Sequence, residues 1–155
     1  MKSLIIKLAS PLTIISLASL EKWWYAIPID GPDTLLYGFP LPFMSEAWHT
    51  SMALQFFGIE FLIDLLFYFV FWLISVYCIH RFVTKIQMPK FLTSGLWTFA
   101  GIILFGATLV ASDSNNLFYV KRPFEMDLLE TGYQFSWQKT ERPNSLNYQR
   151  RSNKN

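Results

Sequence analysis

The sequence predicts an all-α integral membrane protein: a transmembrane helical hairpin, an N-terminal hydrophobic helix and short extended or β segments in the extramembrane tail. Of the 155 residues, 52% are hydrophobic and only 15% are charged, whereas a soluble domain has about 25% charged residues. The apolar residues also lie in long blocks, which is typical of membrane spans. The net charge of +2 and the single cysteine exclude a highly basic nucleic-acid binder and a disulfide-stapled secreted domain.

Residues 1–20 form the first apolar block, which is interrupted by Lys7 and Pro11. Only 13 residues lie between Lys7 and Glu21, fewer than the about 20 that cross a bilayer as a helix. Three interpretations stay open. The segment is an uncleaved signal anchor, which is favoured, or a helix lying at the membrane interface, or a cleaved signal peptide.

Residues 21–44 are rich in aromatic side chains and contain four prolines. Aromatic rings of this kind prefer the membrane–water interface, and prolines prevent a long helix. We therefore expect an extended strap on the outer membrane surface, which is either an anchoring belt or a groove for a partner or lipid. Within it, residues 37–43 (YGFPLPF), followed by a hydrophobic hairpin, resemble a motif of small bacterial membrane proteins. The resemblance implies no activity.

Residues 45–112 are predicted to form the transmembrane hairpin. The run 91–112 has no charged residue over 22 positions, which is long enough to cross the bilayer as a helix. A second span is expected at about 58–80, with Glu60 and Asp64 in its first turns. The loop between the spans, 81–90, contains three basic residues and no acidic one.

Basic residues near the ends of the spans predict the orientation. The N-terminus carries two of them and the 81–90 loop carries three, whereas 21–57 has only Lys22. We therefore expect the N-terminus and this loop in the bacterial cytoplasm, with 21–57 and the tail outside the inner membrane. The inverted orientation stays open, because the tail 113–155 holds seven basic residues.

The tail 113–155 is polar, with isolated aromatic residues. From 132 to 138 ring and polar side chains alternate, which is the period of a half-buried strand, and 117–120 is a candidate partner strand. Two strands alone are marginal in water. This hairpin therefore needs another surface, which is the strap, the membrane or a partner protein. From Glu141 onward the composition predicts disorder.

Glu60 and Asp64 are the strongest candidate site. They lie four residues apart, so on a helix they share one face at about 6 Å. Two carboxylates this close repel each other and both lose hydration near hydrocarbon. We expect them to titrate as one coupled unit and to need a partner, because an acid within a span costs about 2.5–3.5 kcal/mol.

Four further residues extend this candidate site into a polar face. If a helix runs unbroken from Glu46, then Glu46 and His49 fall within about 60° of the acidic pair. On the other span, Thr108 and Ser112 lie level with the pair in an antiparallel hairpin. They belong to a stripe of mainly small and hydroxyl residues, a type of surface that lets membrane helices approach closely. This small-residue stripe consists of Ser94, Thr98, Gly101, Phe105, Thr108 and Ser112.

Three interpretations of the acidic pair stay open. The carboxylates bind groups of this chain, among them the polar face or a basic residue such as Lys121 or Arg122. Alternatively, they bind a basic residue of a partner protein, or they form a proton or cation path.

Metal and cofactor sites are not predicted. His49 and His80 are 31 residues apart, about 46 Å along one helix, so they cannot ligate one centre. Cys78 is the only thiol, and a metal held by Glu46, His49 and Glu60 would need ligands spread over more than three turns. The sequence also lacks a nucleophile elbow, a phosphate-binding glycine loop and an H-E-x-x-H motif.

These observations predict a non-catalytic accessory or assembly subunit, or a scaffold, of a larger complex in a bacterial inner membrane. Its expected partners are membrane lipid and either a larger membrane protein or further copies of itself, with no nucleic acid. One alternative is a proton- or cation-linked membrane component that uses Glu60 and Asp64. A second alternative is a lipid-modifying membrane enzyme that uses His49 and Glu46 as acid–base groups.

Overall fold

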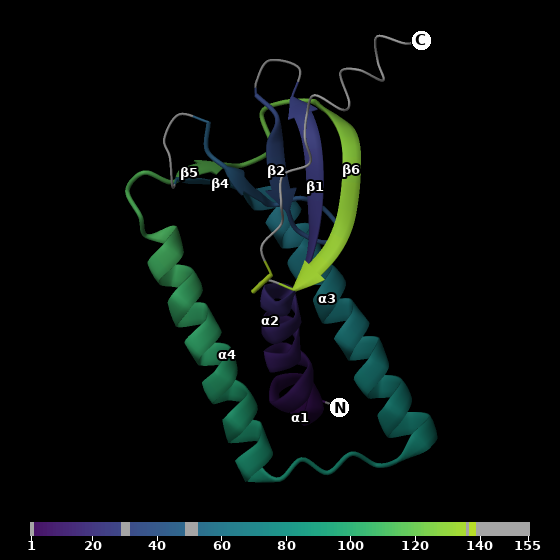
Figure 1. Ribbon diagram of the computed structural model, residues 1–155. Coiled ribbons are helices and arrows are strands. Elements are labelled where there is room, and N and C mark those ends of the chain that lie inside the picture. Colours follow the sequence, from purple (N-terminus) through teal and green to yellow (C-terminus); the bar gives the residue numbers. More distant parts are fainter. Residues whose placement is uncertain (1, 29–31, 49–52, 136, 139–155) are drawn as a thin grey trace.

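The computed structural model describes residues 2–28, 32–48, 53–135 and 137–138. It has a six-stranded mixed sheet at one end and long helices at the other (Figure 1). The predicted all-α fold class is therefore wrong, because the chain has an α/β fold. Nearly all of two of its six strands comes from residues 21–44, the aromatic, proline-containing region that was predicted to be a surface strap.

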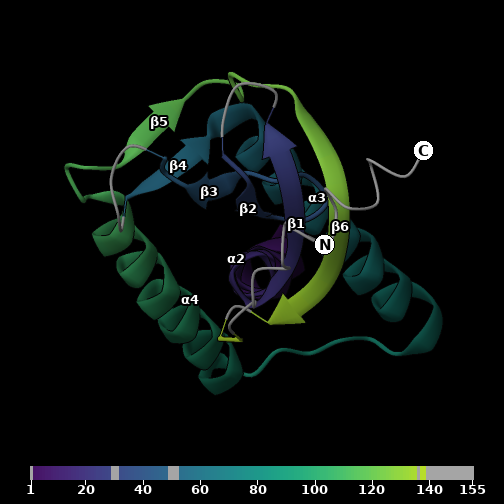
Figure 2. The same ribbon diagram turned by 45° about the horizontal axis from the view of Figure 1, so that its top comes forward.

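The strand order across the sheet is β5-β4-β3-β2-β1-β6. All neighbours are antiparallel except β4 and β5, which are parallel. Figure 2 shows the strands curving from β5 round to β6. The strands are β1 (Leu20–Pro28), β2 (Thr34–Tyr37), β3 (Met44–Glu46), β4 (Leu54–Phe57), β5 (Leu117–Tyr119) and β6 (Met126–Phe135).

The prolines of 21–44 mark the ends of strands rather than a stiff strap. Pro28 is the last residue of β1, Pro32 precedes β2, and Pro40 and Pro42 lie in the loop between β2 and β3. Proline cannot donate to a strand ladder, so it is tolerated at these positions. The aromatic and apolar residues before Pro28 form β1, and those between Pro32 and Pro40 form β2.

The tail pairs with the sheet in two separate places. β6 lies antiparallel to β1, with Tyr133 opposite Lys22. The predicted partner, 117–120, lies at the other edge of the sheet, where β5 pairs with β4. That pairing prediction is wrong. The predicted strand was expected to need one of three surfaces: the segment 21–44, the membrane or a partner protein. The first is observed, because β6 pairs with β1.

Three helical segments lie below the sheet (Figure 1). The N-terminal one is continuous through α1 (Lys2–Leu4), the π-helical η1 (Ile5–Ala9) and α2 (Ser10–Ser19). The second is α3 (Gly58–Cys78), extended by η2 (Ile79–Val83), and the third is α4 (Lys90–Ala111). By length and composition, Gly58–Val83 and Lys90–Ala111 are apolar enough to cross a membrane.

The helix α2 packs against both α3 and α4 and lies between them in both views (Figures 1 and 2). The indole Nε1 of Trp72 on α3 donates to Ser16 Oγ at 2.8 Å. The indole Nε1 of Trp97 on α4 donates to the Ile6 carbonyl oxygen at 3.0 Å. The N-terminal helix is therefore the element that joins the two long helices.

Candidate functional site

The acidic pair lies in the first two turns of α3, where the helix meets the sheet. Asp64 is fully buried and Glu60 is 8% exposed. The Leu41 amide donates to Asp64 Oδ1 at 2.9 Å, and the Arg122 amide donates to Glu60 Oε1 at 3.3 Å. Each carboxylate therefore accepts a backbone hydrogen bond from a different loop of the sheet.

The Asp64 partner belongs to residues 38–43, most of the motif that the sequence analysis singles out. Gly38 has φ +142°, and a Cβ there would collide with the Leu41 carbonyl oxygen and with Phe43. The Gly38 amide donates to the Lys22 carbonyl oxygen at 3.0 Å. These features fold the 38–43 loop over α3, so that the Leu41 amide faces Asp64.

The Glu60 partner belongs to the connection between β5 and β6. The backbone of Arg122 binds Glu60, while its Nε donates to the Phe124 carbonyl oxygen at 3.2 Å. The start of α3 is held on the same side, because the Ile59 amide donates to the Val120 carbonyl oxygen at 2.9 Å. A predicted partner of the acidic pair is the charged side chain of Arg122. In the structure the main-chain amide of Arg122 binds Glu60 instead.

Two oxygens of the pair stay unused in the described part of the chain. Glu60 Oε2 and Asp64 Oδ2 are buried and have no hydrogen-bond partner there. Buried polar atoms without partners are uncommon and call for an explanation. The pair therefore joins α3 to the sheet and keeps one further acceptor on each carboxylate.

The other predicted polar residues do not converge on the pair. Thr108 Oγ1 donates to the Leu104 carbonyl oxygen at 2.8 Å, and Ser112 Oγ donates to the Thr108 carbonyl oxygen at 2.7 Å. Both hydroxyls thus bind their own helix. Glu46 is the last residue of β3, so no helix continues from it to Glu60. His49 lies outside the described residues.

The small-residue stripe of α4 points away from the rest of the chain. All six of its members are exposed, and a Cβ added at Gly101 would meet nothing within 4 Å. On the α2 side of α4, Ala100 is fully buried. The stripe is therefore an open helix face.

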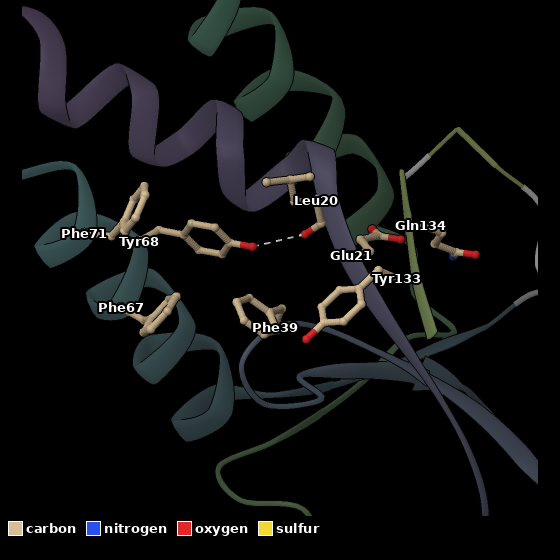
Figure 3. A pocket seen from close by; sticks show the side chains of 8 residues that line it. All are labelled: Leu20, Glu21, Phe39, Phe67, Tyr68, Phe71, Tyr133 and Gln134. Atoms are coloured by element: carbon tan, nitrogen blue, oxygen red, sulfur yellow. Dashed lines mark hydrogen bonds between the residues drawn. The ribbon is translucent and has the colours of Figure 1, made fainter. Parts of the chain in front are cut away.

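A cavity of about 260 Å³ lies where the sheet meets α3, and the sequence analysis does not predict it. Figure 3 shows α3 contributing one wall, the start of β1 and the end of β6 another, and Phe39 of the 38–43 loop closing the side between them. The only sequence signals for it are the ring of Phe39 and the alternating aromatic residues of β6. Its lining residues are Leu20, Glu21, Phe39, Phe67, Tyr68, Phe71, Tyr133 and Gln134.

No group of three or more potential metal ligands is found within the described ranges. Comparison with protein-family models, with curated proteins and with solved structures finds no match to this chain.

Proposed function

We propose that this chain is an integral membrane protein that acts as a non-catalytic accessory or assembly subunit of a larger membrane complex. The observation that carries the proposal is the exposure of its two long apolar helices. In the most apolar 18-residue window of each, only 17% of Gly58–Val83 and 6% of Lys90–Ala111 are buried. The core helix of a soluble protein is mostly buried, and exposed apolar surface of this extent needs lipid or protein to cover it.

The arrangement of charges supports the orientation expected from the sequence. The segment η2 and the connection that follows it lie at the end of the helices away from the sheet (Figure 1) and carry the basic residues Arg81 and Lys85. Basic loops stay in the cytoplasm. In a bacterial inner membrane the sheet then lies on the outer side, with α3 and α4 crossing the bilayer.

The stripe on α4 supports the assembly role. Small residues let membrane helices approach closely, and this face stays open because α4 packs on α2 with its other side. We propose that a helix of a larger membrane protein packs there. A second copy of this chain is the alternative occupant.

The test combines cross-linking in the native host with two matched substitutions. A photo-reactive residue at Thr98 should cross-link to one partner of defined mass, which identifies either a different protein or this chain. Gly101→Leu should abolish the cross-link. Gly106→Leu is the control, because Gly106 is also in open space but lies about 140° around the helix. Equal cross-linking in both variants would contradict the assembly role.

A second candidate function is a proton- or cation-linked membrane component. The observation that favours it is the buried, unpartnered oxygen on each of Glu60 and Asp64. Glu60→Gln and Asp64→Asn keep an acceptor for each loop amide and remove the charge. If these variants insert and assemble but lose an activity that is coupled to proton or cation movement, the pair carries protons or cations. If they retain it, this second function is excluded. The lipid-modifying enzyme stays a prediction, because it depends on His49.

A further inference from the structure

We propose that the cavity between α3 and the sheet is a binding site for one phospholipid, with an acyl chain held among its rings and the phosphate close to Lys22. This inference rests on the membrane placement of the proposed function. It adds a specific lipid site to a protein otherwise surrounded by bulk lipid.

The walls of the cavity match an acyl chain. The ring of Phe39 meets the rings of Phe67 and Tyr133 at centroid distances of 5.5 and 5.7 Å, and Phe71 and Leu20 line the remaining apolar surface. Ligand sites are typically apolar with a few polar groups that fix orientation. The volume of about 260 Å³ is below the roughly 300–1,000 Å³ of sites for drug-sized molecules, so one chain is the suitable occupant.

The cavity opens where lipid would lie. Phe67 and Phe71 are 43% and 52% exposed although they line it, so it is continuous with the open side of α3. In Figure 1 the lower ends of β1 and β6 reach below the top of α4. With α4 across the bilayer, the cavity is at the depth of the outer acyl chains, and a chain enters it from the side.

Polar groups border the end of the cavity towards the sheet. Glu21, Tyr133 and Gln134 line this end (Figure 3), so the phosphate would lie on the Lys22 side, away from the Glu21 carboxylate. The Lys22 ammonium lies 3.7 Å from the ring centroid of Trp24 and 5.8 Å from that of Tyr133. Lysine and aromatic side chains at this depth place their polar ends at the headgroup level. The phosphate of a phospholipid is negatively charged and can accept a hydrogen bond from the Lys22 ammonium.

The hydrogen bonds at the cavity keep its wall in place. The Tyr68 hydroxyl donates to the Leu20 carbonyl oxygen at 3.3 Å (Figure 3). This bond ties α3 to the point where α2 ends and β1 begins. The phenol of Tyr68 is thereby satisfied within the chain, which leaves its ring face as an apolar wall.

The test measures lipid retention by the full-length protein. The protein is reconstituted in vesicles of phosphatidylethanolamine and phosphatidylglycerol, extracted in mild detergent and weighed by native mass spectrometry. We expect one retained phospholipid per chain. Leu20→Trp fills the cavity and should lower retention about tenfold or more, since excluding a few methylene groups is enough for this loss. Leu66→Trp is the matched control, because Leu66 is 53% exposed and does not line the cavity.

Two further variants and one extraction measurement keep the outcome clear. Tyr133→Ala removes a ring that is 73% exposed and should also lower retention, even if Leu20→Trp fails to fold. In vesicles to which diacylglycerol is added, Lys22→Gln should weaken retention of phosphatidylglycerol but not of diacylglycerol, which lacks the phosphate. Equal retention by wild type, Leu20→Trp and Tyr133→Ala would overturn the lipid site. Resistance of the wild type to carbonate extraction tests membrane insertion separately, so a failure there is distinguishable.

Discussion

The helices α3 and α4 are similar in length and apolar character, yet they are attached to the rest of the chain in different ways. α3 carries two buried acids that bind loops of the sheet, and its first turn continues directly from β4. α4 has no charged residue after Lys90, exposes its small-residue stripe and leans on α2. In this chain the charged residues of an apolar helix attach it to the sheet, whereas the helix without them exposes its small-residue face.

The largest effect is expected at the loop that holds Asp64. Gly38→Ala places a Cβ against the Leu41 carbonyl oxygen in a backbone conformation that favours glycine. Strain and overpacking together should lower the free energy of unfolding by about 3–5 kcal/mol. The measurement is chemical unfolding in detergent, followed by tryptophan fluorescence. Gly101→Ala on α4 is the control and should not destabilise, since its Cβ meets open space and alanine favours a helix over glycine. Equal stability of the two variants would remove the distinction between the two helices.

Asp64→Ala should have the next largest effect. It leaves the Leu41 amide without its acceptor and removes a fully buried side chain, which should cost about 2–3 kcal/mol. Asp64→Asn keeps an acceptor oxygen and should cost less. For a chain of this size each kcal/mol lowers the melting temperature by about 2–4 °C, so thermal unfolding separates the two variants. An Asn variant as unstable as the Ala variant would mean that the charge, rather than the acceptor, holds the loop.

Glu60→Ala should destabilise less than Asp64→Ala. The bond from the Arg122 amide is longer, at 3.3 Å, and Glu60 is slightly exposed, so we expect a loss of about 1.5 kcal/mol. Hydrogen exchange of the β5–β6 connection should rise in Glu60→Ala and stay unchanged in Asp64→Ala. Faster exchange of that connection in both variants would show that the two carboxylates hold the sheet as one unit.

The two long helices could be predicted from sequence because their signal is local. The charge-free run 91–112 overlaps α4 almost residue for residue, and the expected span at 58–80 begins at the residue where α3 begins. Length and apolar composition are enough to identify such helices. The position of Glu60 and Asp64 on one helix face followed from the same periodicity.

The sheet was missed in part because the pairings at its two edges, β1 with β6 and β4 with β5, are long-range. β1 pairs with β6 across about a hundred residues, and periodicity within one segment carries no information about a partner that distant. The prolines of 21–44 predicted an extended strap without a long helix, whereas they end β1, precede β2 and lie in the loop after β2. The carboxylate partners were missed for a related reason, since Leu41 and Arg122 contribute main-chain amides that no side-chain pattern reveals.

The smallest effect is expected where α4 meets the N-terminal helix. The Ser10 amide donates to the Ile5 carbonyl oxygen, five residues back. In the same π-helical register the Ile6 carbonyl oxygen would accept from the N–H of residue 11. That residue is Pro11, and proline has no backbone N–H. The Trp97 indole supplies that donor. Trp97→Phe should therefore cost about 1 kcal/mol and loosen α4.

The position of α4 can be followed by the distance between spin labels on Cys78 and on a cysteine introduced at Ser94. Trp97→Phe should broaden that distance distribution. Trp72→Phe serves as the matched control for α3, because Trp72 makes the equivalent indole bond to Ser16 while the sheet also holds α3 through Asp64. The control should broaden the distribution less. Equal broadening would mean that the buried acids fix only the end of α3 next to the sheet. The difference in attachment between α3 and α4 would then be confined to that end.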